Sequence, residues 1–210
     1  MIKVLIADDH AVVREGLKQI LSETPHLVVA DEASDGHEVM DKLNKHTYDL
    51  IVLDISLPGK SGLEILKDIK SQKPKLPVLV LSMYPEEQYA VRVLKAGASG
   101  YLTKESAPNE LLNAVKQITQ GRKYVSPSLA EKLVGELEID TEKPLHETLS
   151  DREYEVMIMI ASGKRIKEIA YDLTLSEKTV STYRIRILEK MGMKSNADLT
   201  RYAISNKLIN

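Results

Sequence analysis

Apolar residues follow two alternating patterns through the first 121 residues of the chain. Short runs of consecutive apolar residues predict strands that are buried on both faces. The runs occupy residues 3–7, 27–30, 50–54, 78–82 and 100–104. Between and after these runs, apolar residues recur at the three- and four-residue spacing that is typical of helices. Five strands alternating with five helices predict a doubly wound parallel sheet, an α/β fold with helices on both faces.

From residue 149 onward the apolar residues keep only helical spacing, which predicts four short helices. Ser150 is the expected N-cap of the first of these helices, Ser176 that of the third and Asn196 that of the fourth. The buried stripe predicted for the third helix consists of Val180, Tyr183, Ile187 and Met191. A short helix, a tight turn and a longer basic helix are typical of a helix-turn-helix, although periodicity alone also permits a plain helical bundle.

Residues 122–146 are expected to connect the two parts of the chain. A short helix can form there with Ser126 as its N-cap. Residues 136–147 are acidic and contain few apolar side chains, which is typical of a linker. The predicted organisation is a first domain over residues 1–121, a linker with a short helix over residues 122–146, and a small all-α domain over residues 147–210.

Polar residues stand at the carboxyl ends of four predicted strands. In an open parallel sheet these ends meet at one edge, and ligands bind there. Taken alone, each residue has a structural explanation, as a helix cap, a turn residue or a solvated surface lysine. Their joint occurrence favours a functional site. The residues are Asp8 and Asp9 after the first strand, Asp54 after the third, Ser82 after the fourth and Lys104 after the fifth.

These residue types indicate phosphoryl chemistry that depends on a divalent cation. Clustered carboxylates repel one another unless a cation joins them, and hard oxygen ligands suit Mg²⁺. An aspartate beside Mg²⁺ can act as a nucleophile toward phosphorus, while a lysine or a hydroxyl can orient phosphoryl oxygens. The chain contains no Gly-x-x-x-x-Gly-Lys loop, which excludes a P-loop nucleotide site.

Composition and charge narrow the class of protein further. The 210 residues include no cysteine, which excludes disulfides and thiolate metal sites. No apolar run approaches the roughly 18 residues of a membrane span, and no secretory signal precedes the first strand, so a cytoplasmic protein is expected. Residues 1–121 carry 14 basic and 17 acidic side chains, a net charge of −3, whereas residues 149–210 carry 11 and 8, a net charge of +3. The basic C-terminal part suggests nucleic acid as a partner.

Over about residues 1–121 the chain resembles the receiver domain of two-component response regulators. The matching residues are Asp8-Asp9, Asp54 followed by Pro58 and Gly62, Ser82, and the run from Tyr101 to Lys104. The resemblance implies a flavodoxin-like sheet whose Asp54 accepts a phosphoryl group from a sensor histidine kinase. One departure is Glu105, because many receivers have a proline there in a cis peptide, and a cis bond before a non-proline residue is costly.

The resemblance also implies a role for each residue of the site, with Mg²⁺ as the cofactor. The implied metal ligands are Asp9, Asp54 and the backbone carbonyl of Ser56, with Asp8 acting through a water molecule. The implied switch pair is Ser82 and Tyr101, and Lys104 is the implied contact to the phosphoryl group.

Over about residues 147–209 the chain resembles the LuxR-type DNA-binding domain. The matching runs are 149–153, 167–170, 175–180 and 189–191. Tyr183 stands where that family usually has histidine, which leaves the base preference open. The third helix is expected to enter the DNA groove, where Arg and Lys suit phosphate or guanine and an isoleucine suits a thymine methyl. The predicted DNA contacts are Lys178, Thr179, Ser181, Thr182, Arg184, Ile185 and Arg186, of which Lys178, Thr179 and Arg184 are better suited to phosphate.

In this order the two domains resemble the NarL/FixJ group of response regulators. We therefore expect a transcription regulator, not a turnover enzyme, that is phosphorylated on Asp54, binds double-stranded DNA and forms a homodimer when phosphorylated. One alternative is an aspartyl-phosphate phosphatase of the haloacid-dehalogenase type, although Ser56 occupies the position of the second aspartate that this family requires. The other is a DNA-binding protein whose receiver has lost phosphorylation, against which the intact Asp9, Asp54 and Lys104 argue.

Overall fold

The computed structural model describes residues 1–126, 129–130 and 144–209. Its contacts divide the chain into two compact units, Met1–Leu133 and Val134–Asn210. The dividing point and most of the predicted linker lie outside the described residues. At the start of the predicted linker helix, the amide of Leu129 donates to Ser126 Oγ at 3.2 Å, which is the contact expected of Ser126 as an N-cap.

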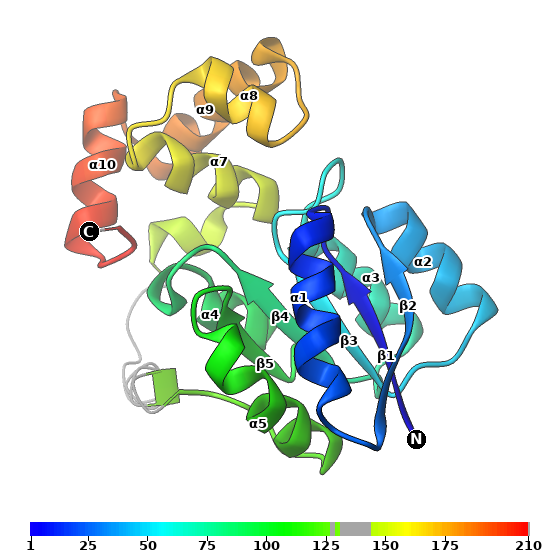
Figure 1. Ribbon diagram of the computed structural model, residues 1–210. Coiled ribbons are helices and arrows are strands. Elements are labelled where there is room, and N and C mark those ends of the chain that lie inside the picture. Colours follow the sequence, from blue (N-terminus) through cyan, green and yellow to red (C-terminus); the bar gives the residue numbers. More distant parts are fainter. Residues whose placement is uncertain (127–128, 131–143, 210) are drawn as a thin grey trace. The chain divides into compact units, whose positions relative to one another are not determined.

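The first unit contains a parallel sheet of five strands in the order β2-β1-β3-β4-β5 (Figure 1). The strands are β1 (Ile2–Ala7), β2 (Leu27–Ala33), β3 (Leu50–Asp54), β4 (Val78–Ser82) and β5 (Gly100–Thr103). The alternating helices are α1 (Ala11–Ser22), α2 (Gly36–Lys45), α3 (Gly62–Gln72), α4 (Glu86–Lys95) and α5 (Ala107–Thr119). The predicted doubly wound α/β fold is confirmed. The strand order changes direction between β1 and β3, so the carboxyl ends of these two strands flank the topological switch point.

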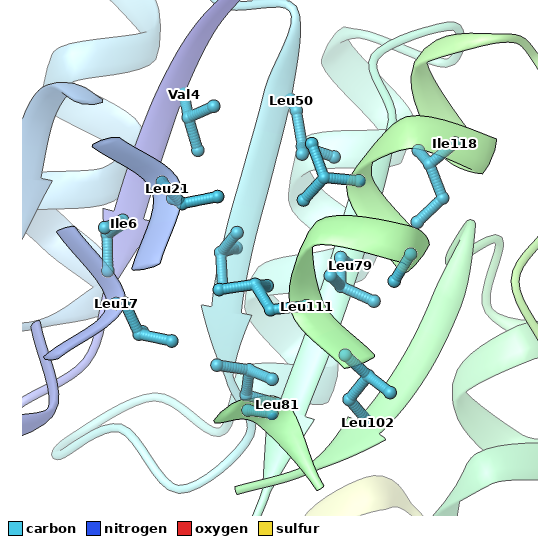
Figure 2. Close-up of a cluster of buried hydrophobic side chains, with 14 of the residues drawn as sticks. Val4, Ile6, Leu17, Leu21, Leu50, Leu79, Leu81, Leu102, Leu111 and Ile118 are labelled. Carbon is cyan, nitrogen blue, oxygen red and sulfur yellow. The ribbon is translucent and has the colours of Figure 1, made fainter. Parts of the chain in front are cut away.

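One face of the sheet packs against α1 and α5 (Figure 2). Leu17 and Leu21 of α1 and Leu111 of α5 belong to the same buried cluster as side chains from four strands of the sheet. Successive side chains of a strand point to opposite faces, and Ile51 and Leu53 of β3 are also fully buried, so the other face is covered too. A sheet that is dry on both faces leaves its carboxyl edge for polar side chains.

The chain that follows α5 folds back along β5. Tyr124 forms a parallel bridge with Gly100, and its amide donates to the Ser99 carbonyl at 2.8 Å. The Tyr124 hydroxyl donates to Glu110 Oε2 of α5 at 2.9 Å. A Cβ on Gly100 would lie 2.9 Å from the Tyr124 carbonyl oxygen, so the glycine permits this close approach. The bridge pairs part of the outer edge of β5, which limits its exposure to other strands.

The second unit is helical, as predicted. Its elements are the 3₁₀ helix η1 (Leu145–Thr148) and the α-helices α7 (Asp151–Ala161), α8 (Ile166–Asp172), α9 (Glu177–Met191) and α10 (Asn196–Ser205). Ser150 caps α7 and Ser176 caps α9, as expected, and Gly192 ends α9 in the left-handed conformation at φ 64°. The N-cap of α10 is Ser195, one position before the predicted Asn196. The Ser195 hydroxyl accepts a hydrogen bond from the Asp198 amide.

The helices of this unit pack around α9. It contacts both α7 and α8, and α7 also contacts α10. Val180, Ile187 and Met191 of the predicted stripe are buried, while Tyr183 is half-buried. The pair α8 and α9, joined by a tight turn, is the predicted helix-turn-helix. None of the described helices has both the length and the apolar composition needed to cross a lipid bilayer.

Candidate functional site

Asp54 is the last residue of β3 and is only 1% exposed. Its Oδ1 accepts the backbone amide of Ser56 at 3.0 Å. The loop beyond it turns back closely, and the amide of Gly62 donates to the Ile55 carbonyl at 2.9 Å. A Cβ on Gly62 would lie 2.4 Å from the Cα of Ile55, so this position requires glycine. The loop therefore holds the Asp54 carboxylate in one place at the edge of the sheet.

Lys104 connects the ends of four strands. Its Nζ lies 2.7 Å from Asp54 Oδ2 and 2.7 Å from Asp8 Oδ2, and its backbone amide donates to the Ser82 carbonyl at 2.7 Å. Burial raises the pKa of Asp54, and the charge of Lys104 acts against this rise. Burial also acts to lower the pKa of Lys104, but the two carboxylates outweigh it and hold that pKa above its usual range. The peptide bond from Lys104 to Glu105 is trans, like the others in the described residues.

The two acids that follow β1 differ in their surroundings. Asp8 is 1% exposed, and its Oδ1 accepts the amide of His10 at 2.8 Å. Its buried Oδ2 has the ionic contact with Lys104 but makes no well-aligned hydrogen bond to a described residue. Asp9 is more exposed, and its Oδ1 lies 2.6 Å from His10 Nδ1. Since His10 is the N-cap residue of α1, the alternative reading of Asp9 as a helix cap is wrong.

The side chains at this edge form a cluster that suits a cation. One ligand atom from each of Asp8, Asp9, His10 and Asp54 lies within 4.8 Å of the others. Carboxylate oxygens are the hard donors that Mg²⁺ prefers. The buried Asp8 Oδ2, which lacks an aligned hydrogen bond, can accept one from a water molecule on such an ion. The residues present therefore fit a hard divalent cation, and Ser56, the source of the implied carbonyl ligand, follows two residues after Asp54.

Ser82 and Tyr101, the predicted switch pair, meet at the backbone of Tyr84. Ser82 is fully buried at the end of β4, and its Oγ accepts the Tyr84 amide at 3.0 Å. The buried Tyr101 donates its hydroxyl to the Tyr84 carbonyl at 2.7 Å. The sequence analysis did not identify Tyr84, because it takes part through its backbone. The only signal in the sequence is its position two residues after Ser82. Ser82 and Tyr101 therefore bond to the amide and the carbonyl of the same residue.

The outer face of α9 presents four of the seven predicted DNA contacts to solvent. Lys178, Thr182, Ile185 and Arg186 are exposed, with Ile185 at 53%, and Ser181 is half-buried. The Thr182 hydroxyl donates to the Lys178 carbonyl at 2.9 Å and is therefore engaged within the helix. Neither Lys178 nor Arg186 forms an ion pair within the part of the chain that the structure describes. Both cations are thus free of a competing protein anion there.

Other polar side chains of α9 bond to its own N-cap and to neighbouring helices. The Thr179 hydroxyl lies 2.7 Å from the N-cap hydroxyl of Ser176. Arg184 Nε donates to Asn196 Oδ1 of α10 at 2.6 Å, so this predicted phosphate contact also joins two helices. Near the end of α9, Lys190 Nζ donates to Oε2 of Glu153, the capping-box residue of α7, at 2.6 Å. These bonds set the orientation of the exposed face.

Known families match both parts of the chain. Residues 4–116 match the response regulator receiver domain family, and residues 147–203 match the luxR family of bacterial regulatory proteins. Over 214 residues the chain is 38% identical to the oxygen regulatory protein NreC of Staphylococcus carnosus, covering 99% of both proteins. It is 33% identical to the response regulator UvrY of Escherichia coli over 211 residues, covering 100% of this chain and 97% of that protein.

Solved structures of a related regulator have the same two-part architecture. The RcsB response regulator of Salmonella typhimurium matches with a TM-score of 0.69 and 28% identity, covering 98% of both chains. An RcsB–DNA complex matches with a TM-score of 0.61 and 29% identity, covering 97% of this chain and 98% of that one. The chain therefore belongs to the NarL/FixJ family of response regulators, with a receiver domain followed by a LuxR-type helix-turn-helix DNA-binding domain that regulates transcription.

Proposed function

We propose that Asp54 accepts a phosphoryl group from a sensor histidine kinase and that this modification controls DNA binding by the second unit. The observation that carries the proposal is the position of Lys104 Nζ, 2.7 Å from the carboxylates at the ends of both β1 and β3. A protonated lysine between two fixed acids can exchange one of these contacts for a phosphoryl oxygen. Membership of the response-regulator family supports the proposal.

The transfer is an in-line displacement at phosphorus. An oxygen of the ionised Asp54 carboxylate forms the new O–P bond while the bond from phosphorus to the imidazole nitrogen of the donor breaks, and the imidazole keeps the electron pair. Lys104 offsets the charge on the phosphoryl oxygens. Asp9, Asp54 and the Ser56 carbonyl would hold Mg²⁺, with Asp8 acting through water. When bound, that ion supplies the remaining neutralisation of phosphoryl charge.

The product is an acyl phosphate that is hydrolysed slowly, so the protein does not act as a turnover enzyme. A haloacid-dehalogenase phosphatase has a second aspartate two residues after its nucleophile, whereas Ser56 stands there in this chain. A serine hydroxyl lacks the near-neutral pKa of a good general acid or base. Phosphorylated Asp54 therefore persists as a signal.

The effect of phosphorylation is passed on through the switch pair, Ser82 and Tyr101. A phosphoryl oxygen offers the Ser82 hydroxyl a strong new acceptor. Ser82 Oγ accepts the Tyr84 amide at 3.0 Å, so rotation of the hydroxyl toward the phosphoryl group would move or release that segment. Tyr101, which is bonded to the Tyr84 carbonyl, moves with it.

The DNA-binding surface is the outer face of α9. Lys178 and Arg186 suit phosphate or guanine, and the exposed Ile185 suits a thymine methyl. Arg184 has further guanidinium nitrogens that suit phosphate, and the helix N-terminus at Thr179 also favours an anion. Ser181 and Thr182 complete the groove-facing set.

Phosphorylation acts by pairing two copies of the chain. One helix of this length reads few base pairs, so a homodimer on paired half-sites is needed for selectivity. A solved structure described as two RcsB dimers bound to two parallel DNAs supports this assembly. The receiver over residues 1–121, the linker over 122–146 and the DNA-binding domain over 147–210 permit such pairing. The protein would work in the cytoplasm, where a kinase and the DNA are both accessible.

Acetyl phosphate with Mg²⁺ tests the assignment by intact-mass analysis of the full-length protein. We expect the wild type to gain one phosphoryl group and Asp54→Asn to gain none, because the amide nitrogen is a poor nucleophile. Equal labelling of the two proteins would refute the assignment. Multiple turnovers of a chromogenic phosphate ester would instead favour the phosphatase.

A further inference from the structure

Arg14 of α1 contacts the acidic turn from outside the charged cluster. Its Nη1 donates to the backbone carbonyl of Asp8 at 2.7 Å, and its Nε donates to Glu32 Oε2 of β2 at 2.9 Å. The side chain of Arg14 is only 17% exposed and that of Glu32 33%. One guanidinium therefore joins the end of β1 to the end of β2.

The Arg14 bond completes the set of contacts that holds Asp8. The Asp8 amide donates to the Ala33 carbonyl at 3.1 Å, its Oδ1 accepts the His10 amide, and its Oδ2 contacts Lys104. The Asp8 carbonyl lies beyond Ala7, the last residue of β1, where no strand neighbour continues the ladder. Arg14 supplies the hydrogen bond that the ladder would otherwise give.

This bond also determines where Asp9 lies. The peptide between Asp8 and Asp9 is planar, so fixing the Asp8 carbonyl fixes the direction of the Asp9 N–H and of the Asp9 Cα. We infer that Arg14 is a positioning residue for the cation site, because it clamps the Asp8–Asp9 peptide and so keeps the Asp9 carboxylate beside Asp54. The inference rests on the proposed cation-dependent phosphorylation at Asp54.

The anchor of Arg14 is itself well held. Lys18 Nζ donates to Glu32 Oε1 at 2.7 Å. The hydrogen bond from Lys18, with a further one from Arg14, holds the pKa of Glu32 below its usual range despite burial. Glu32 thus stays ionised and keeps the guanidinium in place. Because Lys18 itself helps to hold Glu32, the control is a lysine outside this network: Lys45 of α2, which pairs with the exposed Asp41.

Arg14→Lys is the most informative variant, because it keeps the charge. A lysine ammonium is a point charge on a different stem and cannot reproduce the fixed fork that spans the two acceptors. We expect its dissociation constant for Mn²⁺, counted as free ion by electron paramagnetic resonance with Mg²⁺ as competitor, to rise about tenfold, as for other residues that orient metal ligands. The phosphorylation rate at saturating Mg²⁺ should stay near that of the wild type. Lys45→Met should change the dissociation constant by less than about twofold.

The variants test the positioning role of Arg14, whereas the wild type tests the proposed function. Wild-type binding of Mn²⁺ by Arg14→Lys would overturn the positioning role, even if thermal unfolding shows that the variant is less stable. Should Arg14→Lys not fold, Glu32→Gln keeps Arg14 and weakens only its anchor, and we expect a smaller loss of Mn²⁺ affinity. An unchanged affinity in Glu32→Gln would equally overturn the inference. A wild type that binds neither Mn²⁺ nor phosphoryl at Asp54 would defeat the proposed function itself.

Discussion

The two polar regions of this protein hold their charges in opposite ways. At the carboxyl edge of the receiver sheet, Asp8 and Asp54 are each 1% exposed and share Lys104, whose side chain is 10% exposed. On the outer face of α9, by contrast, Lys178 and Arg186 are exposed and form no ion pair within the described residues. The first region is assembled in advance, whereas the second is left open for a partner.

The two proposed functions require this contrast. Phosphoryl transfer requires groups that are fixed at about 3 Å from the reacting atoms in a site of low dielectric, where charges interact strongly. Binding of a polyanion gains affinity by releasing counterions, which requires hydrated cations at the surface. Substitutions in the first region should therefore alter stability and chemistry together. Those in the second should alter only DNA binding, in a salt-dependent way.

The largest effect is expected from Lys104→Met. This change leaves two buried carboxylates without their shared cation, and breaking such a group typically costs ~3 kcal/mol of unfolding free energy. Phosphorylation should be lost as well. Urea unfolding followed by circular dichroism measures the stability, with Lys60→Met as control, because Lys60 pairs with Asp68 at the surface, where the side chains are 51% and 38% exposed. That control should cost no more than about 0.5 kcal/mol. Equal losses in the two variants would remove the contrast between buried and exposed charges.

A smaller effect is expected from Asp9→Ala, which tests whether the more exposed acid belongs to the buried cluster. Removing a direct carboxylate ligand should raise the Mg²⁺ dissociation constant by up to about a hundredfold. Stability should change by less than about 0.5 kcal/mol, because Asp9 caps no helix. Phosphorylation time courses across a Mg²⁺ titration measure this effect, and Asp41→Ala in α2 is the matched exposed acid. Unchanged Mg²⁺ dependence in Asp9→Ala would exclude it from the cation site.

The open face of α9 is tested by Lys178→Ala. Loss of one phosphate contact should weaken binding to all DNA sequences by about fivefold and lower the slope of log K against log salt by about one unit. Fluorescence anisotropy at several salt concentrations measures both quantities, with Lys45→Ala of the receiver as the control. A loss confined to one base position would show instead that Lys178 reads a base.

The smallest effect is expected from Lys190→Met, which removes one anchor of α9. Burial acts to raise the pKa of Glu153, but the bonds from Lys190 and Ser150 outweigh it and hold that pKa below its ordinary value of 4.5. A depressed carboxylate pKa adds stability above the unfolded pKa, and this stability is lost as the pH falls through the folded pKa. Lys190 is 44% exposed, so screening limits the loss to about 0.5 kcal/mol. Urea titrations at about pH 6 and pH 3.5 should show a smaller difference at the lower pH; an equal difference at both would mean that packing, not the ion pair, is responsible.

The fold followed closely from the sequence, because buried parallel strands produce unbroken apolar runs. The end of β2 did not, since the strand extends to Ala33 although its apolar run ends at Ala30. Asp31 and Glu32 lie beyond the apolar run, yet they pair with β1 in the sheet. Each also forms an ion pair with a basic side chain of a neighbouring helix: Asp31 with Lys42 and Glu32 with Arg14. Their role depends on partners that no local pattern reveals.

The charged cluster at the carboxyl edge of the sheet could also be predicted from the sequence. Parallel topology brings the carboxyl ends of strands together, so the residues at those ends were sufficient to predict that their side chains cluster. Contacts from a side chain to the backbone of another element could not be predicted from the sequence. The hydrogen bond from Arg14 to the Asp8 carbonyl is an example. Arg184 illustrates the same limit, because its bond to Asn196 depends on how two helices pack.

The most direct test of the account asks whether the buried cluster controls the exposed face. DNA selected from a random pool is titrated with full-length protein, with and without acetyl phosphate and Mg²⁺, while light scattering reports the mass of the protein. We predict that the phosphorylated wild type forms a dimer and binds the selected DNA about tenfold more tightly, whereas Asp54→Asn responds in neither assay. Equal affinity with and without phosphoryl donor, or the same gain in Asp54→Asn, would contradict the account.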